Sequence, residues 1–269
     1  MSRGPRPYYV PVGNEEQVFQ AAFRQRLPIL LKGPTGCGKT RFIEAMAFDL
    51  ERPLITVACH DDLTTADLVG RFLIQGGDTQ WVDGPLTRAV REGAICYLDE
   101  IVEARQDTTV VLHPLADHRR QMPIDRLGQT LEAAPEFCLV VSYNPGYQSV
   151  LKDLKDSTRQ RMVAIEVDFP PPDIEEKIVA HEAGVDHQIA ALLVQLGQAI
   201  RRLQTAGLRE VASTRVLVAA GQLVAAGLGL RAATRAAVAG PLTDDPLVTK
   251  GLFEMIDAYL GEERASDGD

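Results

Sequence analysis

The most informative stretch of the chain reads Gly33-Pro34-Thr35-Gly36-Cys37-Gly38-Lys39-Thr40. An apolar run at residues 27–31 precedes it and has the character of a short buried strand. Residues 41–50 follow it, with apolar side chains at helical spacing. A strand, then a glycine-rich loop that ends in Lys-Thr, then a helix is the context in which such a loop binds phosphate. We therefore predict a polyphosphate site at residues 33–40.

The chemistry of this loop suits the triphosphate of a nucleotide. Its glycines let successive backbone N–H groups curl around phosphate oxygens, and the N-terminus of the following helix adds partial positive charge. Lys39 can reach the β- and γ-phosphates, and the Thr40 hydroxyl can ligate Mg²⁺. We interpret Cys37 as a small residue tolerated in the loop. All eight residues are expected to bind ATP. The alternative is an ordinary glycine turn before a helix.

The composition excludes several classes of protein. The chain has 269 residues and a net charge of −9, which disfavours non-specific binding to nucleic acid or to an anionic membrane. Its four cysteines are far apart and show no metal-ligand spacing, as in a protein of a reducing compartment. The first residues lack the apolar core of a signal peptide, and the longest apolar run, residues 216–230, is too short to cross a bilayer. We expect a cytoplasmic protein with no nucleic-acid or membrane partner.

The order of apolar segments predicts two domains. Continuous apolar runs are typical of the strands of a parallel sheet covered on both faces, and they occur at residues 27–32, 54–59, 94–98, 137–143 and 164–169. Three prolines at 170–172 end this pattern, and we expect a helix to begin only after them, with Asp173 as its cap. Helical spacing then follows at residues 174–183, 188–204, 213–226 and 246–260. We predict a doubly wound α/β core over residues 1–172, an all-α domain over 173–262 and a disordered tail over 263–269.

Two further strands end in polar side chains. Residues 95–98 lead into Asp99 and Glu100, and in a parallel sheet that end of the strand faces the ligand. Asp99 could hold the Mg²⁺ shell through water, and Glu100 could activate the water that attacks the γ-phosphorus. Residues 139–143 lead into Asn144, which Pro145 forces into an extended conformation. Its amide could bind the attacking water or the γ-phosphate. A solvated Asp-Glu turn and a common Asn-Pro turn are the alternatives.

The order of these motifs resembles a known family. Residues 33–40, Leu98-Asp99-Glu100, Val141-Ser142-Tyr143-Asn144-Pro145 and Ser157-Thr158-Arg159-Gln160-Arg161 occur in the order found in AAA+ ATPases of the MoxR branch. Within that branch the chain is similar to the CbbQ/NorQ/GvpN group, and most similar to the CbbQ type, the motor subunit of a Rubisco activase. The resemblance covers residues 9–260. It implies a P-loop AAA+ core with a five-stranded parallel sheet, followed by a small all-α lid.

The resemblance also implies roles for residues that spacing alone does not assign. Asn144 matches the sensor-1 residue. Arg161 matches an arginine finger contributed across a subunit boundary, and Arg159 is a second candidate. Arg215 matches the lid arginine called sensor 2, although Arg215 could instead pair with an acidic neighbour at a capped helix start. Two insertions, near 68–86 and 119–132, are expected to face a pore or a partner; the second has the pattern of a hairpin, and in the first we expect Trp81 to be packed.

The expected function is that of a ring-forming, hexameric, Mg²⁺-dependent ATPase that remodels a partner protein. By resemblance, the partners are an adaptor with a von Willebrand A domain, of the CbbO type, and Rubisco blocked by an inhibitory sugar phosphate. Activation of nitric oxide reductase, as by NorQ, and a gas-vesicle role, as for GvpN, are the alternatives within the group. A P-loop kinase and a nucleic-acid motor are less consistent with the Asp-Glu pair and the acidic net charge.

Overall fold

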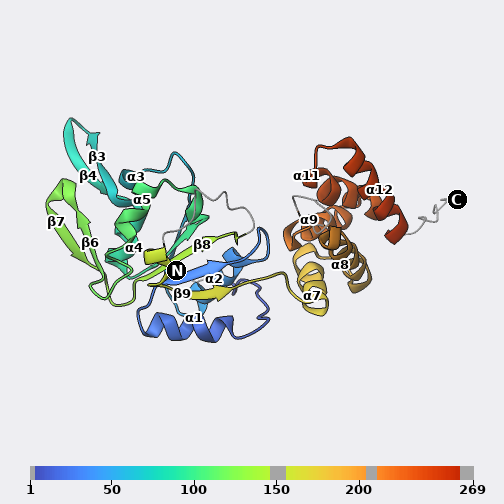
Figure 1. Ribbon diagram of the computed structural model, residues 1–269, viewed down its shortest axis with the longest axis horizontal. Helices are drawn as coiled ribbons and strands as arrows, with labels where there is room; N and C mark the ends of the chain where they lie inside the picture. Colours follow the sequence, from blue (N-terminus) through green and yellow to red (C-terminus); the bar gives the residue numbers. More distant parts are fainter. Residues whose placement is uncertain (1–3, 146–155, 204–210, 261–269) are drawn as a thin grey trace. The chain divides into compact units, whose positions relative to one another are not determined.

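A parallel five-stranded sheet forms the centre of the first part of the chain in the computed structural model, which describes residues 4–145, 156–203 and 211–260. The strands lie in the order β2-β5-β8-β1-β9 (Figure 1). Their bounds are β1 Ile29–Lys32, β2 Leu54–Ala58, β5 Ile95–Asp99, β8 Cys138–Tyr143 and β9 Val163–Glu166. The prediction of a parallel α/β sheet built from these five apolar runs is confirmed.

The last strand is shorter than predicted because its partner ends. β9 pairs only with β1, and Glu166 lies opposite Lys32, the last residue of β1. Beyond this point the chain of β1 turns into the glycine loop, so β9 has no ladder to continue. One more backbone bond forms, from the Val167 N–H to the Lys32 carbonyl at 2.8 Å. Residues 167–169 therefore lie outside the sheet.

Both faces of the three central strands of the sheet, β1, β5 and β8, are buried. Alternate strand residues, among them Leu30, Leu98 and Val141, pack into one apolar cluster with side chains of helix α4 (Pro85–Glu92). The intervening residues Ile29 and Ile95 are also fully buried, as expected for the opposite face. In Figure 1, α1 lies below the sheet and α3 and α5 lie above it. This two-sided burial explains why the strands read as continuous apolar runs.

Short helices and two hairpins surround the sheet. The remaining helices of this part are α1 Glu15–Arg24, α2 Lys39–Asp49, α3 Thr65–Val69, α5 Gln106–Thr109 and α6 Asp156–Arg159, with 3₁₀ turns η1 Ile101–Glu103, η2 Val110–Leu112 and η3 Asp125–Leu127. The hairpins are β3 Gly70–Gln75 with β4 Asp78–Asp83, and β6 Gln121–Ile124 with β7 Gln129–Glu132. Both project at the left of Figure 1. The predicted second hairpin is confirmed, and the first insertion is a hairpin too.

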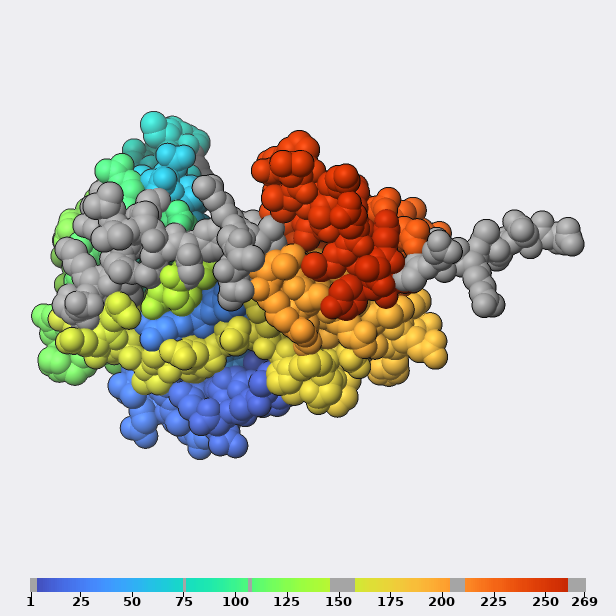
Figure 2. Space-filling view, turned by 45° about the vertical axis from the view of Figure 1, so that its right-hand side comes forward, coloured from blue at the N-terminus to red at the C-terminus, as the bar shows by residue number. Residues whose placement is uncertain are grey.

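The β3–β4 hairpin exposes apolar side chains. Its turn is formed by Gly76 and Gly77, whose φ angles of 62° and 91° favour glycine. Trp81 packs edge-on against Phe72, with ring centroids 5.2 Å apart, and also against the buried core cluster, as predicted. Ile74 is nevertheless 80% exposed. Figure 2 shows the cyan hairpin standing at the surface of this part of the protein.

The second part of the chain is helical. Its elements are α7 Pro172–Ala183, α8 His187–Arg202, α9 Thr214–Ala225, α10 Leu230–Thr234, a π-helical turn η6 Arg235–Ala239, α11 Gly240–Leu242 and α12 Pro246–Leu260. The prediction that helix α7 begins only after the prolines is wrong: it starts at Pro172, with Pro171 at the N-cap, because proline lacks only an N–H that the first helical position does not use. In the described ranges, no helix combines the length and apolarity that crossing a bilayer requires.

Contacts divide the chain into two compact units. The first comprises Met1–Pro34 and Lys39–Val167, and the second comprises Thr35–Gly38 and Asp168–Asp269. A buried carboxylate ties helices of the second unit together. Glu175 of α7 accepts hydrogen bonds from the Arg201 guanidinium of α8 at 2.6 and 2.7 Å, and from the Thr214 hydroxyl of α9 at 2.6 Å. The Arg201 guanidinium also lies 4.1 Å from the ring centre of Phe169.

Candidate functional site

Three predicted groups meet at the carboxyl-terminal ends of the strands. All five strands are parallel, so their carboxyl ends lie along the same edge. The glycine loop follows β1, Asp99 is the last residue of β5, and Asn144 follows β8 directly. Because β8 lies between β5 and β1, Asn144 stands between the loop and the carboxylates. Topology thus brings together motifs that are about 60 and 45 residues apart in the chain.

The glycine loop has the backbone that its sequence demands. Gly36 and Gly38 have φ angles of +74° and +106°, which side chains disfavour. Lys39 begins α2 and is only 8% exposed, and its ammonium donates to the carbonyls of Gly33 at 2.7 Å and Pro34 at 2.9 Å. The charge is therefore held at the loop itself, where phosphate oxygens would be stronger acceptors than carbonyls.

Glu100 has an unusual backbone. Its φ and ψ angles of 55° and 48° are left-handed, a conformation that costs a non-glycine residue about 1–2 kcal/mol. Two hydrogen bonds stabilise the turn: its N–H donates to the Ser142 hydroxyl at 3.1 Å, and its carbonyl accepts from the Glu103 N–H at 2.8 Å. The side chain is exposed, so its carboxylate can bind water. Such strain concentrates at functional sites.

Two buried hydroxyls that the sequence analysis did not assign hold Asp99. Its Oδ1 atom accepts hydrogen bonds from the Tyr97 hydroxyl at 2.7 Å and from the Ser142 hydroxyl. Tyr97 and Ser142 are both fully buried, and burial raises the pKa of Tyr97, so the phenol stays protonated and can donate. The Thr40 side chain lies close enough to the Tyr97 hydroxyl to oppose part of this rise in pKa. The only signal in the sequence was a polar atom within each of two apolar strands.

The oxygen donors at this edge fit Mg²⁺. The Thr40 side chain and the Asp99 carboxylate both lie beside the Tyr97 hydroxyl, so a hydroxyl and a carboxylate lie close together. Mg²⁺ prefers such oxygen ligands, and on a nucleotide it is held mainly by phosphates and waters with one or two protein groups. In the described part of the chain, no three His, Cys, Asp or Glu side chains gather into a separate metal site.

The predicted finger arginines lie near the amino-terminal ends of the strands. Arg159 ends α6, and Arg161 precedes β9 by two residues. β9 begins at Val163, opposite Ile29 at the start of β1, so Arg161 lies at the amino end of the strands. Its side chain is exposed, and the guanidinium donates to the His113 carbonyl at 3.3 Å. The structure therefore does not bring Arg161 together with the loop of its own chain.

Arg215 lies near the start of a helix in the second unit. It is the second residue of α9 and is exposed, whereas Thr214 before it is buried and bonded to Glu175. Gly36, which belongs to the same unit, has no room for a side chain: a Cβ atom there would lie 2.6 Å from the side chain of Ser213 and 3.5 Å from Cβ of Arg215. The start of α9 thus faces a residue of the glycine loop.

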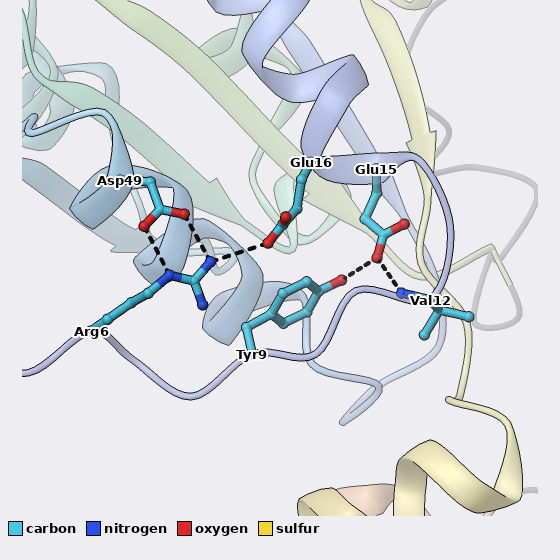
Figure 3. Close-up of polar contacts among 6 residues, drawn as sticks. All are labelled: Arg6, Tyr9, Val12, Glu15, Glu16 and Asp49. Carbon is cyan, nitrogen blue, oxygen red and sulfur yellow. Dashed lines mark hydrogen bonds and ion pairs between the residues drawn. The ribbon is translucent and has the colours of Figure 1, made fainter.

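A segment before α1 packs beside the loop helix α2 and was not anticipated. Arg6 forms two bonds of 2.8 Å with Asp49 of α2 and one of 3.1 Å with Glu16 of α1 (Figure 3). Tyr9 stacks obliquely on Phe42 of α2, with ring centroids 5.2 Å apart, and its hydroxyl donates to Glu15 at 2.9 Å. The residues around the loop helix are therefore fixed from the amino-terminal side as well.

Glu15 is the acceptor at the centre of this packing. Besides the Tyr9 hydroxyl, its carboxylate accepts from the N–H groups of Val12 and Gly13, each at 2.8 Å. Burial opposes ionisation, but these hydrogen bonds to the charged form outweigh it and lower the pKa of Glu15 below its usual 4.5.

Comparison with known families agrees with this geometry. Residues 28–162 match the model of the AAA domain of the dynein-related subfamily, and residues 175–259 match the CbbQ/NirQ/NorQ C-terminal family. A solved structure of a RuvB variant from Thermotoga maritima is similar in fold, with a TM-score of 0.52 at 15% identity over 96% of this chain and 91% of that one.

Three named relatives are similar over nearly their whole length. Protein NorQ of Paracoccus denitrificans is 60% identical over 95% of this chain and 94% of its own. The denitrification regulatory protein NirQ of Stutzerimonas stutzeri is 59% identical over 95% and 93%. Protein CbbQ of Hydrogenophilus thermoluteolus is 58% identical over 89% and 90%. These identities do not distinguish the three kinds of relative.

Proposed function

The chain belongs to the CbbQ/NirQ/NorQ family of AAA+ ATPases and is an ATP hydrolase, and we propose that six copies form a ring that hydrolyses Mg²⁺-ATP at subunit boundaries and remodels a partner protein. The observation that carries this proposal is the position of Arg161. Strand β1 separates the end of the sheet where Arg161 lies from the glycine loop, and it is about 10 Å long at 3.3 Å per residue. Arg161 therefore serves the triphosphate of a neighbouring copy, which requires a closed arrangement of subunits.

Each residue beside the glycine loop has one role in this proposal. The glycine loop and Lys39 bind the phosphates. Thr40 and Asp99 hold Mg²⁺, which neutralises charge on the β- and γ-phosphates when bound. The exposed carboxylate of Glu100 orients the attacking water and takes its proton, and Asn144 binds that water or the γ-phosphate.

Arginine side chains supply the remaining groups that the reaction needs. A guanidinium from the neighbour stabilises charge on the transferring phosphoryl group, an effect of about 10³–10⁵ in rate in related NTPases. Arg161 is the main candidate because it is exposed, and Arg159 is the second. Arg215 of the lid contacts the phosphates from α9, a role supported by the approach of α9 to Gly36.

A mixing experiment tests the shared site. Arg161→Ala should keep nucleotide binding and lose hydrolysis, whereas Lys39→Ala should lose binding. In a random mixture of equal amounts, about a quarter of the boundaries combine an intact loop with an intact finger, so activity should reappear. Arg88→Ala, which removes another exposed arginine of the same unit, is the control and should hydrolyse ATP normally. Failure to recover activity at every mixing ratio would contradict the shared site.

The partner is proposed from the resemblance to CbbQ. We propose Rubisco carrying an inhibitory sugar phosphate as the client, reached through an adaptor with a von Willebrand A domain. A second candidate, a denitrification enzyme such as nitric oxide reductase, is favoured by the relative named a denitrification regulatory protein. Purified chain, adaptor and ATP should restore carboxylation by inhibited Rubisco. Restored nitric oxide reduction instead would select the second client.

A further inference from the structure

The hydroxyl pair on Asp99 leaves its two carboxylate oxygens in different environments. Oδ1 accepts from both Tyr97 and Ser142. Oδ2 has no hydrogen-bond partner among residues 4–145, 156–203 and 211–260. A carboxylate held by two donors on one oxygen can rotate little, so the other oxygen has a fixed direction.

The Ser142 hydroxyl also controls the next residue. It donates its single proton to Asp99 and accepts the N–H of Glu100 at 3.1 Å. One buried atom on β8 therefore fixes both the side chain of Asp99, the last residue of β5, and the left-handed backbone of Glu100, which follows it. Ser142 is fully buried, so its side chain is shielded from solvent.

The chain of hydroxyls reaches the loop helix as well. The Tyr97 hydroxyl bonds to Asp99 and Ser142, and it lies beside the side chain of Thr40, the second residue of α2. Its ring is fully buried in β5, so its hydroxyl cannot move without repacking the sheet. Side-chain hydrogen bonds thus connect β5 and β8, and the Thr40 hydroxyl of α2 lies beside them, where the motifs meet.

We propose that Ser142 and Tyr97 are positioning residues, which direct Oδ2 of Asp99 toward the hydrated Mg²⁺ and hold Glu100 in the conformation that presents its carboxylate to water. This inference rests on the proposed assignment of Asp99 to the Mg²⁺ shell. Hydrogen bonds that orient a metal-site ligand typically change metal affinity or activity 10- to 100-fold. Ser142 bonds directly to the Asp99 carboxylate and to the Glu100 N–H, whereas Tyr97 bonds to Asp99 and reaches Glu100 only through the Ser142 hydroxyl, at 3.1 Å.

The test measures binding without hydrolysis, in a Glu100→Gln background. The affinity of a fluorescent ATP analogue is determined with excess Mg²⁺ and with EDTA, and the ratio gives the gain due to Mg²⁺. Ser142→Ala and Tyr97→Phe should each reduce this gain about tenfold and leave the affinity in EDTA within about twofold. Ser142→Thr, which keeps the hydroxyl, should retain most of the gain.

A matched variant controls for the loss of a buried hydroxyl. Thr87 is fully buried and donates to the Val69 carbonyl, outside the site, so Thr87→Val should leave the Mg²⁺-dependent gain unchanged. With Glu100 intact, Ser142→Ala should lower kcat by at least tenfold, and its KM for Mg²⁺-ATP should rise in line with the lost Mg²⁺-dependent gain in affinity. Tyr97→Phe keeps the shape of the core, so it remains informative if Ser142→Ala unfolds at too low a temperature for the assay.

The outcomes separate this inference from the proposed ring. An unchanged Mg²⁺-dependent gain in both Ser142→Ala and Tyr97→Phe would overturn the inference, and so would an equal loss in Thr87→Val. A Glu100→Gln background with no Mg²⁺-dependent gain would overturn both the inference and the assignment of Asp99. Failure of the subunit mixing with an intact effect of Ser142→Ala would overturn only the ring.

Discussion

Replacing Glu175 by glutamine tests how the helical unit is held together. Glu175 is fully buried, and the side chain of its partner Arg201 is 14% exposed. Glu175→Gln removes the charge and keeps the shape, which leaves the Arg201 guanidinium without its carboxylate. Removing one partner of a buried pair destabilises a protein by about 3–5 kcal/mol. Because Arg201 keeps its bond to the Ala212 carbonyl and its contact with Phe169, we expect the lower end, about 3 kcal/mol.

Calorimetry measures the effect directly. For a unit of roughly 100 residues, 1 kcal/mol shifts Tm by about 4–8 °C, so the transition of this unit should fall by more than ~10 °C. Glu254→Gln is the matched control: the same substitution in the same unit breaks the exposed pair with Lys250, which should matter by less than ~0.5 kcal/mol. Equal shifts in the two variants would refute the argument.

Three further predictions concern the first unit. Lys39→Ala should weaken ATP binding by more than about tenfold in equilibrium titrations, because it removes the cation held in the glycine loop. The lowered pKa of Glu15 stabilises the fold above about pH 4.5, and this contribution disappears as the pH falls through the folded-state pKa; Glu15→Gln should therefore flatten the acid side of a plot of Tm against pH. Burial raises the pKa of Cys59, Cys96 and Cys138 to about 12, so at pH 8 mass spectrometry should find these thiols alkylated only after unfolding.

Local patterns predicted the parts of the fold that local physics determines. β1, the glycine loop and α2 follow one another in the chain, and the apolar run, the glycines and the helical spacing each specify their own element. The central strands β1, β5 and β8 were recognisable because burial on both faces leaves no polar alternation. The late start predicted for α7 failed because the prolines were treated only as breakers, although proline suits the first helical position.

The unpredicted features depend on partners that are distant in sequence. Ser142 bonds to Asp99 across 43 positions, and this pairing exists only because β5 and β8 are neighbours in register. Glu175 and Arg201 are 26 positions apart on different helices, and neither has a motif around it. Strand order and helix packing decide such contacts, so the pattern of a short stretch of sequence does not reveal them.

The backbone hydrogen bond between the Val167 N–H and the Lys32 carbonyl joins two connections of the chain. Lys32 is the last residue before the glycine loop, and Val167 is the last residue of the first unit before the tether that leads into the helices. The residue that precedes the glycine loop is therefore bonded directly to the residue that precedes the second unit. Two connections of the chain, the one into the phosphate-binding loop and the one into the helices, thus begin side by side just past the ends of β1 and β9.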